Sequence, residues 1–183
     1  DWAGMLGTPH LAAMNAIIER NEIDDLIRVN EALQEKKIAQ IADMICSNSQ
    51  TRLVLIAGPS SSGKTTFAQR LLIQLRVNGR RPVSISLDNY FIDKVLTPLD
   101  EDGEYDFEAI EALKLDLFNE HLGRLIAGEE VEVPIYDFKL GASLPKGMPL
   151  TVPPGEPIII EGIHGLNDRL TWSIPKEQKF KIY

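Results

Sequence analysis

Residues 58–65 read Gly58-Pro59-Ser60-Ser61-Ser62-Gly63-Lys64-Thr65, and this stretch satisfies the phosphate-loop pattern G-x-x-x-x-G-K-S/T. Because the pattern is short, its surroundings determine how much it means. An apolar run of strand length, Leu53–Ala57, comes directly before it and is typical of a parallel strand buried on both faces. Residues 64–77 follow with apolar side chains at helical spacing. This order of strand, loop and helix predicts a site for a nucleoside triphosphate.

The residue types of the loop suit the chemistry of phosphate binding. Glycines permit a backbone path that wraps N–H groups around phosphate oxygens, and the positive end of the following helix points at the same anion. Lys64 would bring a positive charge to the β- and γ-phosphates, and the Thr65 hydroxyl would ligate magnesium, a hard ion that prefers oxygen. We therefore expect ATP and magnesium as cofactors. The alternative, a serine-rich turn that only caps a helix, leaves the order Gly-Lys-Thr unexplained.

Apolar runs of strand length recur along the chain. Residues 82–87, 157–160 and 180–183 form three more of them, and helical patterns separate the runs. Strands that alternate with helices predict an α/β fold, with a parallel P-loop NTPase sheet and flanking helices. Residues 131–138 alternate weakly and could pair with residues 150–152 as a hairpin.

Most of residues 1–50 reads as helix. Thr8 followed by Pro9 has the pattern of a helix N-cap and a first-turn proline, and Asn21 interrupts the apolar stripe. We expect this segment to be a helical linker or extension, and residues 51–183 to form the P-loop domain.

Two acidic residues follow predicted strands, at the sheet edge where open α/β sheets bind ligands. Glu161 ends the run at 157–160, where P-loop proteins hold magnesium or its water shell. It could instead face water at a strand end. Asp88 follows the run at 82–87 and would lie beside the phosphate loop if that strand neighbours the first. There it could accept the proton of an attacking hydroxyl, or it could open a turn with Asn89, and the spacing leaves both roles open.

The overall charge and composition exclude some classes of partner. The 183 residues carry a net charge of −8, and such a surface repels nucleic acid and anionic membranes, so we expect neither as a partner. No apolar run reaches the length of about 18 residues that a membrane span needs. The single cysteine, Cys46, fits a reducing compartment, and the N-terminus lacks a signal-peptide pattern. We therefore expect a cytoplasmic protein, and a homo-oligomer remains open.

Five blocks at compatible spacings resemble the uridine kinase and phosphoribulokinase family of P-loop kinases. They are residues 58–66, Leu87-Asp88-Asn89-Tyr90-Phe91, Tyr105-Asp106-Phe107, Val133-Pro134-Ile135-Tyr136-Asp137-Phe138 and Ile159-Ile160-Glu161-Gly162-Ile163. The resemblance covers residues 52–183. It implies an ATP-dependent kinase that transfers the γ-phosphoryl group to a hydroxyl, with a nucleoside such as uridine or cytidine as the favoured acceptor. It also implies ATP contacts along the whole loop from Gly58 to Thr66.

The resemblance also implies roles for single residues. Asp88 matches the catalytic base, which acts together with the lysine of the loop, and Tyr90 lies in the same acceptor-site segment. Asp106 matches the acid that hydrogen-bonds the ribose hydroxyls, and Tyr136 matches an aromatic beside the nucleobase. Glu161 matches the acid that ends the central strand near the metal, and we count it among the substrate-binding residues as well.

The sequence departs from the family pattern in three places. In uridine kinases a histidine and an arginine that help to read the pyrimidine follow the Tyr-Asp-Phe block, whereas residues 139–145 contain neither. Phe107 and Glu108 stand where the family has His-Pro. The family also continues past the last strand into a lid helix with arginines, so the resemblance implies a chain that is incomplete at its C-terminus. Residues 31–42 resemble a segment that joins such kinases to an upstream domain similar to part of threonyl-tRNA synthetase, which implies a fused domain.

His164 follows the fifth block, and no second histidine lies at metal-ligand spacing from it. It is either a loop residue near the substrate, and thus a substrate-binding candidate, or a satisfied structural residue. His10 and His121 read as surface or helix residues.

Two functions compete with that of a nucleoside kinase. One keeps the kinase chemistry and makes the acceptor a phosphorylated sugar, as in phosphoribulokinase. The other is a non-catalytic module that binds a nucleotide and reports its state to a fused domain.

Overall fold

The computed structural model describes residues 2–183. The chain forms two compact units that divide after Ile41. We call the part before this division the N-terminal unit and the part from Ala42 to Tyr183 the sheet unit.

The N-terminal unit is helical. It contains α1 (Trp2–Met5), α2 (Leu11–Glu19) and most of α3 (Ile23–Ser47). The start of α2 corrects the expectation of a cap at Thr8 and Pro9, because His10 is the N-cap and its Nδ1 accepts a hydrogen bond from the Ala13 amide at 3.2 Å. Asn21 separates α2 from α3 as the sequence suggests, and its φ of 55° lies in the left-handed region that asparagine tolerates.

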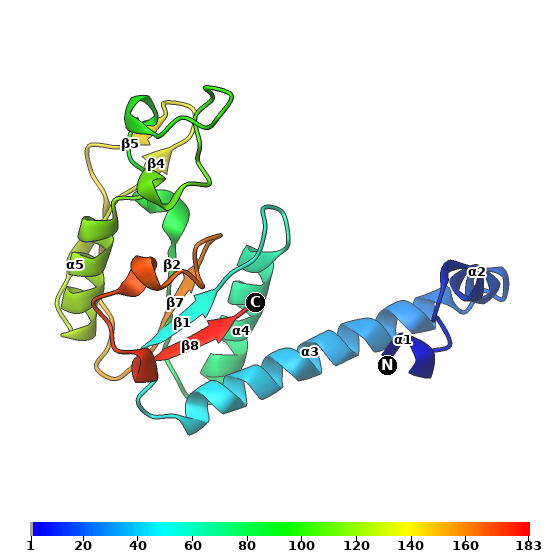
Figure 1. Cartoon of the computed structure of the whole chain (residues 1–183). Coiled ribbons are helices and arrows are strands. Elements are labelled where there is room, and N and C mark those ends of the chain that lie inside the picture. Colours follow the sequence, from blue (N-terminus) through cyan, green and yellow to red (C-terminus); the bar gives the residue numbers. More distant parts are fainter. Residues whose placement is uncertain (1) are drawn as a thin grey trace. The chain divides into compact units, whose positions relative to one another are not determined.

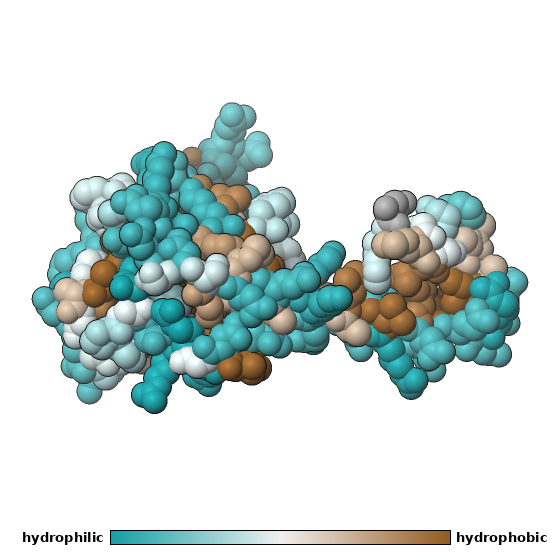
Figure 2. All heavy atoms as spheres, turned by 90° about the horizontal axis from the view of Figure 1, so that it is seen from below, coloured by the Kyte–Doolittle hydropathy of each residue, from teal (hydrophilic) through white to brown (hydrophobic). Residues whose placement is uncertain are grey.

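Several large apolar side chains of the N-terminal unit are exposed to solvent. Met5 and Leu11 are more than 70% exposed, and Ile18 and Ile27 are about half exposed. Figure 2 shows apolar side chains, coloured brown, gathered over these helices. The unit therefore leaves an apolar surface uncovered within the part of the chain that is described.

A four-stranded parallel sheet organises the sheet unit (Figure 1). Its strands stand in the order β2 (Val83–Ser86), β7 (Ile158–Glu161), β1 (Leu53–Ile56) and β8 (Lys179–Ile182). All three pairings are parallel. This confirms the expected α/β class, but it corrects one detail. The strand before Asp88 does not neighbour the first strand, because β7 lies between them.

The two faces of the sheet are covered by helices. Leu53, Leu55 and Ile160 pack in one buried cluster with Phe118 and Leu122 of α5 (Leu115–Ile126). Helix α4 (Lys64–Val77) packs against β7 and β2 and buries its own apolar stripe, which contains Ala68, Leu71 and Leu75. Successive strand residues point to opposite faces. Continuous apolar strands are therefore what a sheet covered on both sides requires.

Short elements connect the strands and helices of the sheet unit. The expected hairpin forms between β3 (Val131–Val133) and β6 (Met148–Leu150), and a second small pair joins β4 (Tyr136–Asp137) to β5 (Ala142–Ser143). Five single turns of 3-10 helix complete the described elements: η1 (Leu87–Tyr90), η2 (Lys94–Leu96), η3 (Ile110–Ala112), η4 (Asp168–Thr171) and η5 (Lys176–Gln178).

The helices of the described residues do not qualify as membrane spans. Among residues 2–183, none combines the length and the apolar character needed to cross a bilayer.

Candidate functional site

The register of the sheet places the carboxyl ends of β1, β7 and β2 next to one another. Glu161 at the end of β7 pairs with Ile56 of β1 on one side and with Ser86 of β2 on the other. The phosphate loop follows the first of these neighbours, and Asp88 follows the second. Glu161 therefore stands between the two segments that the sequence analysis singled out.

The phosphate loop has the backbone that its glycines predict. Gly63 has a φ of 86° and precedes α4 directly, a conformation that residues with a Cβ adopt only at a cost. A Cβ on Gly58 would lie 2.8 Å from Ser62 Oγ, so the loop also closes tightly at its first glycine. No side chain caps α4. Its first N–H groups are therefore left for another acceptor, which suits an anion.

The reactive side chains of the loop have specific partners. Lys64 Nζ donates a hydrogen bond to the Pro59 carbonyl at 2.7 Å and so folds back over the loop. The Thr65 hydroxyl donates to Glu161 Oε1 at 3.1 Å. Two hard oxygen atoms from different elements thus converge beside the loop, and this is the donor type that magnesium prefers. The donor set fits a magnesium ion that takes its remaining ligands from phosphate and water.

No larger metal site is available in the described residues. Across residues 2–183, no group of three or more His, Cys, Asp or Glu side chains is arranged to hold a metal ion. A magnesium ion on a bound nucleotide needs only one or two protein ligands. Thr65 and Glu161 would suffice for it.

Asp88 lies within electrostatic reach of the phosphate loop although its strand is not the neighbour of β1. The residue is exposed, and its amide donates to Ser86 Oγ at 3.4 Å. Nearby atoms nevertheless desolvate the carboxyl group and raise its pKa, while the charge of Lys64 acts in the opposite direction. A carboxyl group with a raised pKa is a better proton acceptor than an ordinary aspartate.

Asp106 lies within electrostatic reach of His164. Asp106 Oδ1 accepts hydrogen bonds from the amides of Glu108 and Ala109 and thereby fixes the turn before η3. Desolvation lowers the pKa of His164, while its hydrogen bond to the Ala109 backbone and the charges of Glu111 and Asp106 act to raise it. Its Nε2 is buried and has no partner among the described residues. The imidazole is therefore not the fully satisfied structural histidine that the sequence left open.

Tyr90 is placed in the core, in contrast to the expectation that it contacts the acceptor. It is fully buried, and its ring packs against Phe118 with ring centroids 4.8 Å apart. Its hydroxyl shares a hydrogen bond of 3.0 Å with His121 Nδ1, and burial raises its pKa. His121 is likewise buried and lies in α5, so of the two expected placements, surface or helix, the helix is the one observed. Tyr90 therefore packs in the core from the same turn that carries Asp88. Its side chain is not accessible to a ligand in this structure.

Tyr136 belongs to a group of aromatic side chains. Its ring centroid lies 5.6 Å from that of Phe91 and 5.0 Å from that of Phe138. Phe91 in turn contacts Phe107, beside Asp106, at 5.7 Å. The Tyr136 hydroxyl is buried without a partner in the described part of the chain, and desolvation, followed by the charge of Asp93, raises its pKa. Buried hydroxyls are nearly always paired in folded proteins, so this one suggests a missing ligand or water.

The stretch that departs from the family pattern forms the β4–β5 pair and its turn. The Gly141 carbonyl accepts a hydrogen bond from the Lys94 amide at 2.7 Å, and Ser143 Oγ accepts one from Lys114 Nζ at 2.6 Å. Lys94 also lies over the ring of Tyr105 at 5.2 Å. Two lysines that the sequence analysis did not select thus approach this hairpin. No pattern in one sequence marks them, because their loops meet only in the fold.

Comparisons with known proteins agree with this geometry. The model of the Phosphoribulokinase / Uridine kinase family matches residues 53–183. The uridine kinase of Chloroflexus aurantiacus (strain J-10-fl) is 37% identical over 111 residues, which are 61% of this chain and 51% of that protein. The uridine kinase of Halobacterium salinarum is 32% identical over 113 residues, 62% of this chain and 48% of that protein. The chain thus spans about half the length of the curated relatives it matches.

Other similar proteins carry different names. The inorganic pyrophosphatase TTM2 of Arabidopsis thaliana is 38% identical over 118 residues, 64% of this chain but 16% of that protein. Among solved structures, a possible uridine kinase from Bacillus stearothermophilus has a TM-score of 0.52 at 20% identity and covers 78% of this chain and 76% of that one. The D-glycerate 3-kinase of Cryptococcus neoformans has a TM-score of 0.52 at 20% identity, covering 70% of this chain and 52% of that one. These structures show that the fold is that of P-loop kinases.

The family match covers the sheet, the phosphate loop and the two acidic strand ends together. The chain therefore belongs to the phosphoribulokinase/uridine kinase family of P-loop kinases.

Proposed function

We propose that the protein transfers the γ-phosphoryl group of ATP to a hydroxyl of a nucleoside. One observation carries this proposal: the phosphate loop and Asp88 follow β1 and β2, which pair with β7 on either side and end level with Glu161, and the charge of Lys64 acts on the Asp88 carboxyl group. A group that binds the donor phosphates and a group that can accept a proton thus lie within reach of one another. That is the arrangement a direct phosphoryl transfer requires.

In the proposed reaction, the loop from Gly58 to Thr66 binds the phosphates of ATP through its backbone N–H groups. Asp88 accepts the proton of the acceptor hydroxyl, whose oxygen forms a bond to the γ-phosphorus as the bond to the β-phosphate oxygen breaks and ADP leaves. Lys64 stabilises the charge on the transferred group. Magnesium held by Thr65 and Glu161 would supply further positive charge to the phosphate oxygens.

The acceptor side supports a nucleoside through three polar groups. The hydrogen bonds that Asp106 accepts from the Glu108 and Ala109 amides both end on Oδ1. Its Oδ2 can therefore accept hydrogen bonds from ribose hydroxyls. The Tyr136 hydroxyl and His164 Nε2 are both buried without partners among residues 2–183. Burying such groups unpaired costs about 1–3 kcal/mol each. A ligand or water that donates to them or accepts from them would remove that cost.

An Asp88→Asn variant tests the catalytic assignment. It should bind ATP as the parent does but lose transfer by about 10²- to 10⁴-fold. The pH profile gives a second readout. Because the pKa of Asp88 is raised from 3.8, the transfer rate of the parent should fall as the pH is lowered through that raised value, and this limb should vanish in the variant. Undiminished transfer by Asp88→Asn would overturn the assignment.

The acceptor needs a separate experiment. Purified protein with ATP and magnesium would be assayed against uridine, cytidine, other nucleosides and a set of sugar phosphates. Phosphorylated nucleoside supports the proposal, and phosphorylated sugar phosphate supports the phosphoribulokinase-like alternative. ATP binding without turnover of any acceptor supports a regulatory module. The match to part of a protein named as a pyrophosphatase is a reason to test that alternative.

Organisation and location are part of the same proposal. We infer a helical extension over residues 1–50 and a P-loop kinase domain over residues 51–183, fused to an upstream domain in a cytoplasmic protein. The chain leaves α3 at Ser47 and enters β1 at Leu53, which supports a connection near residue 50, whereas the compact sheet unit already begins at Ala42, within α3. Limited proteolysis that cuts first between Ser47 and Leu53 would agree with a boundary there.

A further inference from the structure

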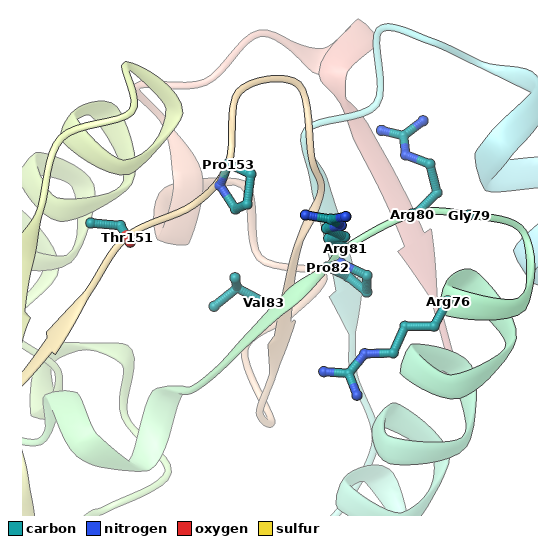
Figure 3. Close-up of a pocket in the computed structure, with 8 residues that line it drawn as sticks. All are labelled: Arg76, Gly79, Arg80, Arg81, Pro82, Val83, Thr151 and Pro153. Atoms are coloured by element: carbon teal, nitrogen blue, oxygen red, sulfur yellow. The ribbon is translucent and has the colours of Figure 1, made fainter.

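A pocket of about 700 Å³ lies at the edge of the sheet opposite to the phosphate loop. Its lining comes from three segments, which Figure 3 shows together: Arg76 at the end of α4, Gly79–Val83 at the turn into β2, and the facing residues Thr151 and Pro153. None of these residues takes part in the proposed transfer site. The pocket is therefore a separate place on the molecule.

Three of the eight lining residues are arginines, in a protein whose net charge is −8. Arg80 is already engaged, because its Nε donates to Glu156 Oε2 at 3.1 Å and its other nitrogen donates to the Gly155 carbonyl at 2.7 Å. Arg76 and Arg81 differ. Within residues 2–183, neither of their guanidinium groups has a hydrogen bond or an ion pair. Two positive charges are thus available to a ligand.

The carboxylate of Glu156 lies beside the pocket without lining it, and it is already engaged by Arg80 and by the Arg81 amide. Burial acts to raise the pKa of Glu156, but the hydrogen bonds from the Arg81 amide and the Arg80 side chain outweigh it and lower that pKa. Glu156 forms an ion pair with the Arg80 guanidinium, and the charge of Arg81 also acts on it although the Arg81 guanidinium makes no direct ion pair with it. Asp43, near the turn at Asn78, accepts a hydrogen bond from that asparagine and does not line the pocket.

The remaining lining is mostly apolar. Pro82, Val83 and Pro153 present hydrocarbon surface between and opposite the arginines. Ligand sites in proteins commonly combine such surface with a few charged groups that fix orientation. Guanidinium groups bind phosphate oxygens in paired hydrogen bonds.

We propose that this pocket binds a small organic phosphate, with its phosphate group held by Arg76 and Arg81 and its organic part against Pro153 and Val83. Such a ligand would join the last turn of α4 to the first residue of β2. The same helix begins at Lys64, and the same strand leads to Asp88. The ligand would therefore contact, at their far ends, the two elements that carry the donor and acceptor sides of the site.

The test reads the two arginines directly by NMR. Their Nε–Hε signals, assigned from Arg76→Lys and Arg81→Lys variants, would be followed while inorganic phosphate or phenyl phosphate is added to protein saturated with a non-hydrolysable ATP analogue and magnesium. Both signals should shift saturably, and phenyl phosphate should bind more tightly than inorganic phosphate because it also covers the apolar surface. The double variant Arg76→Ala/Arg81→Ala should bind phenyl phosphate about tenfold more weakly.

Arg28 serves as the control, because it is exposed in the N-terminal unit with only a 3.6 Å ion pair to Asp25. Equal, non-saturating shifts at Arg28, Arg76 and Arg81 would mean charge screening only and would overturn the proposal. So would equal affinity of the double variant and the parent. Since the readout needs no turnover, a failed kinase assay leaves this result unaffected.

Discussion

The Thr65 hydroxyl donates a hydrogen bond of 3.1 Å to Glu161 Oε1, and this contact joins the start of α4 to the end of the central strand β7. The two residues are far apart in sequence and meet only because Glu161 lies level with the last residue of β1. Their oxygens are the described protein ligands that best fit magnesium on a bound nucleotide.

Replacing Glu161 by glutamine tests this reading. The amide oxygen can still accept the Thr65 hydrogen bond, so the fold should persist, but the negative charge toward the metal is lost. We expect the magnesium concentration for half-maximal transfer to rise about 10- to 100-fold. Thermal unfolding checks the fold, and Glu120→Gln on the exposed side of α5 is the matched control. An unchanged magnesium dependence in Glu161→Gln would place the metal elsewhere.

Tyr136→Phe removes a buried hydroxyl that has no partner in the described structure. Because nothing in the protein loses a hydrogen bond, stability should stay the same or rise slightly. If the hydroxyl contacts the acceptor, KM for the acceptor should rise about tenfold while KM for ATP stays constant. Steady-state kinetics at varied acceptor and varied ATP separate the two. Tyr105→Phe, which alters an exposed ring, should change neither constant, and equal effects of both variants would contradict the assignment.

The Tyr90–His121 pair predicts how stability depends on pH. Desolvation lowers the pKa of His121 below its ordinary 6.5; the charge of Glu120 acts in the opposite direction, and the charge of Arg124 lowers the pKa further. The unfolded chain therefore takes up this proton at a higher pH than the folded protein. Stability is fully present above about pH 6.5 and is lost as the pH falls below it, by at most about 1.4 kcal/mol per pH unit from one group.

Urea unfolding at a series of pH values measures that slope. His121→Asn keeps a polar partner for the Tyr90 hydroxyl but does not titrate, so its slope should be smaller than that of the parent. His164 also has a lowered pKa, so part of the slope should remain. A variant with the full parental slope would show that His121 does not titrate in this way.

Gly162 permits the close approach of two segments of the site. A Cβ at this position would lie 2.9 Å from Leu87 Cβ, directly before Asp88. Gly162→Ala should therefore cost about 1–3 kcal/mol of stability and reduce transfer by displacing the Asp88 turn. Gly123→Ala is the control, because nothing lies within 4 Å of its Cβ position in α5. It should stabilise the protein by about 0.5–1 kcal/mol, and denaturant unfolding checks both variants.

The sequence predicted the strand, the loop and the helix of residues 53–77 well because its signals are local. The pattern at 58–65, the apolar strand before it and the helix at 64–77 lie within one short segment, and each constrains the next. Helix α4 has the predicted bounds for this reason. Glu161 could be recognised in the same way, as the acid that ends an apolar strand.

The order of strands could not be read from the chain. The alternation of strands with helices along the chain predicts a parallel sheet. It does not give the order in which the strands lie side by side in that sheet. The sequence puts Asp88 beside the phosphate loop only if its strand neighbours the first one, and the structure inserts β7 between the two. The carboxyl group still lies within electrostatic reach of Lys64, because all parallel strands end at the same edge.

The acceptor side was predicted least well, because burial depends on distant segments. Tyr90 lies in a segment with the family pattern, yet its side chain is covered by Phe118 and His121 from α5. The helical pattern of α5 does not reveal which loop it covers. Lys94 and Lys114 were missed for the same reason, since each meets the 141–143 hairpin only after folding.

The central place of β7 has a consequence for how the chain acquires its structure. Leu53 of β1 and Val83 of β2 both pair with Ile158 of β7, which lies roughly 100 and 75 residues later in the sequence. These pairings close long loops, and they should therefore form slowly. Until residue 161 has left the ribosome, the strands that lead to the phosphate loop and to Asp88 have no common partner. A nascent chain that is shorter than this should expose two strands, β1 and β2, without their sheet partners, and unpaired strand edges of this kind are prone to aggregation.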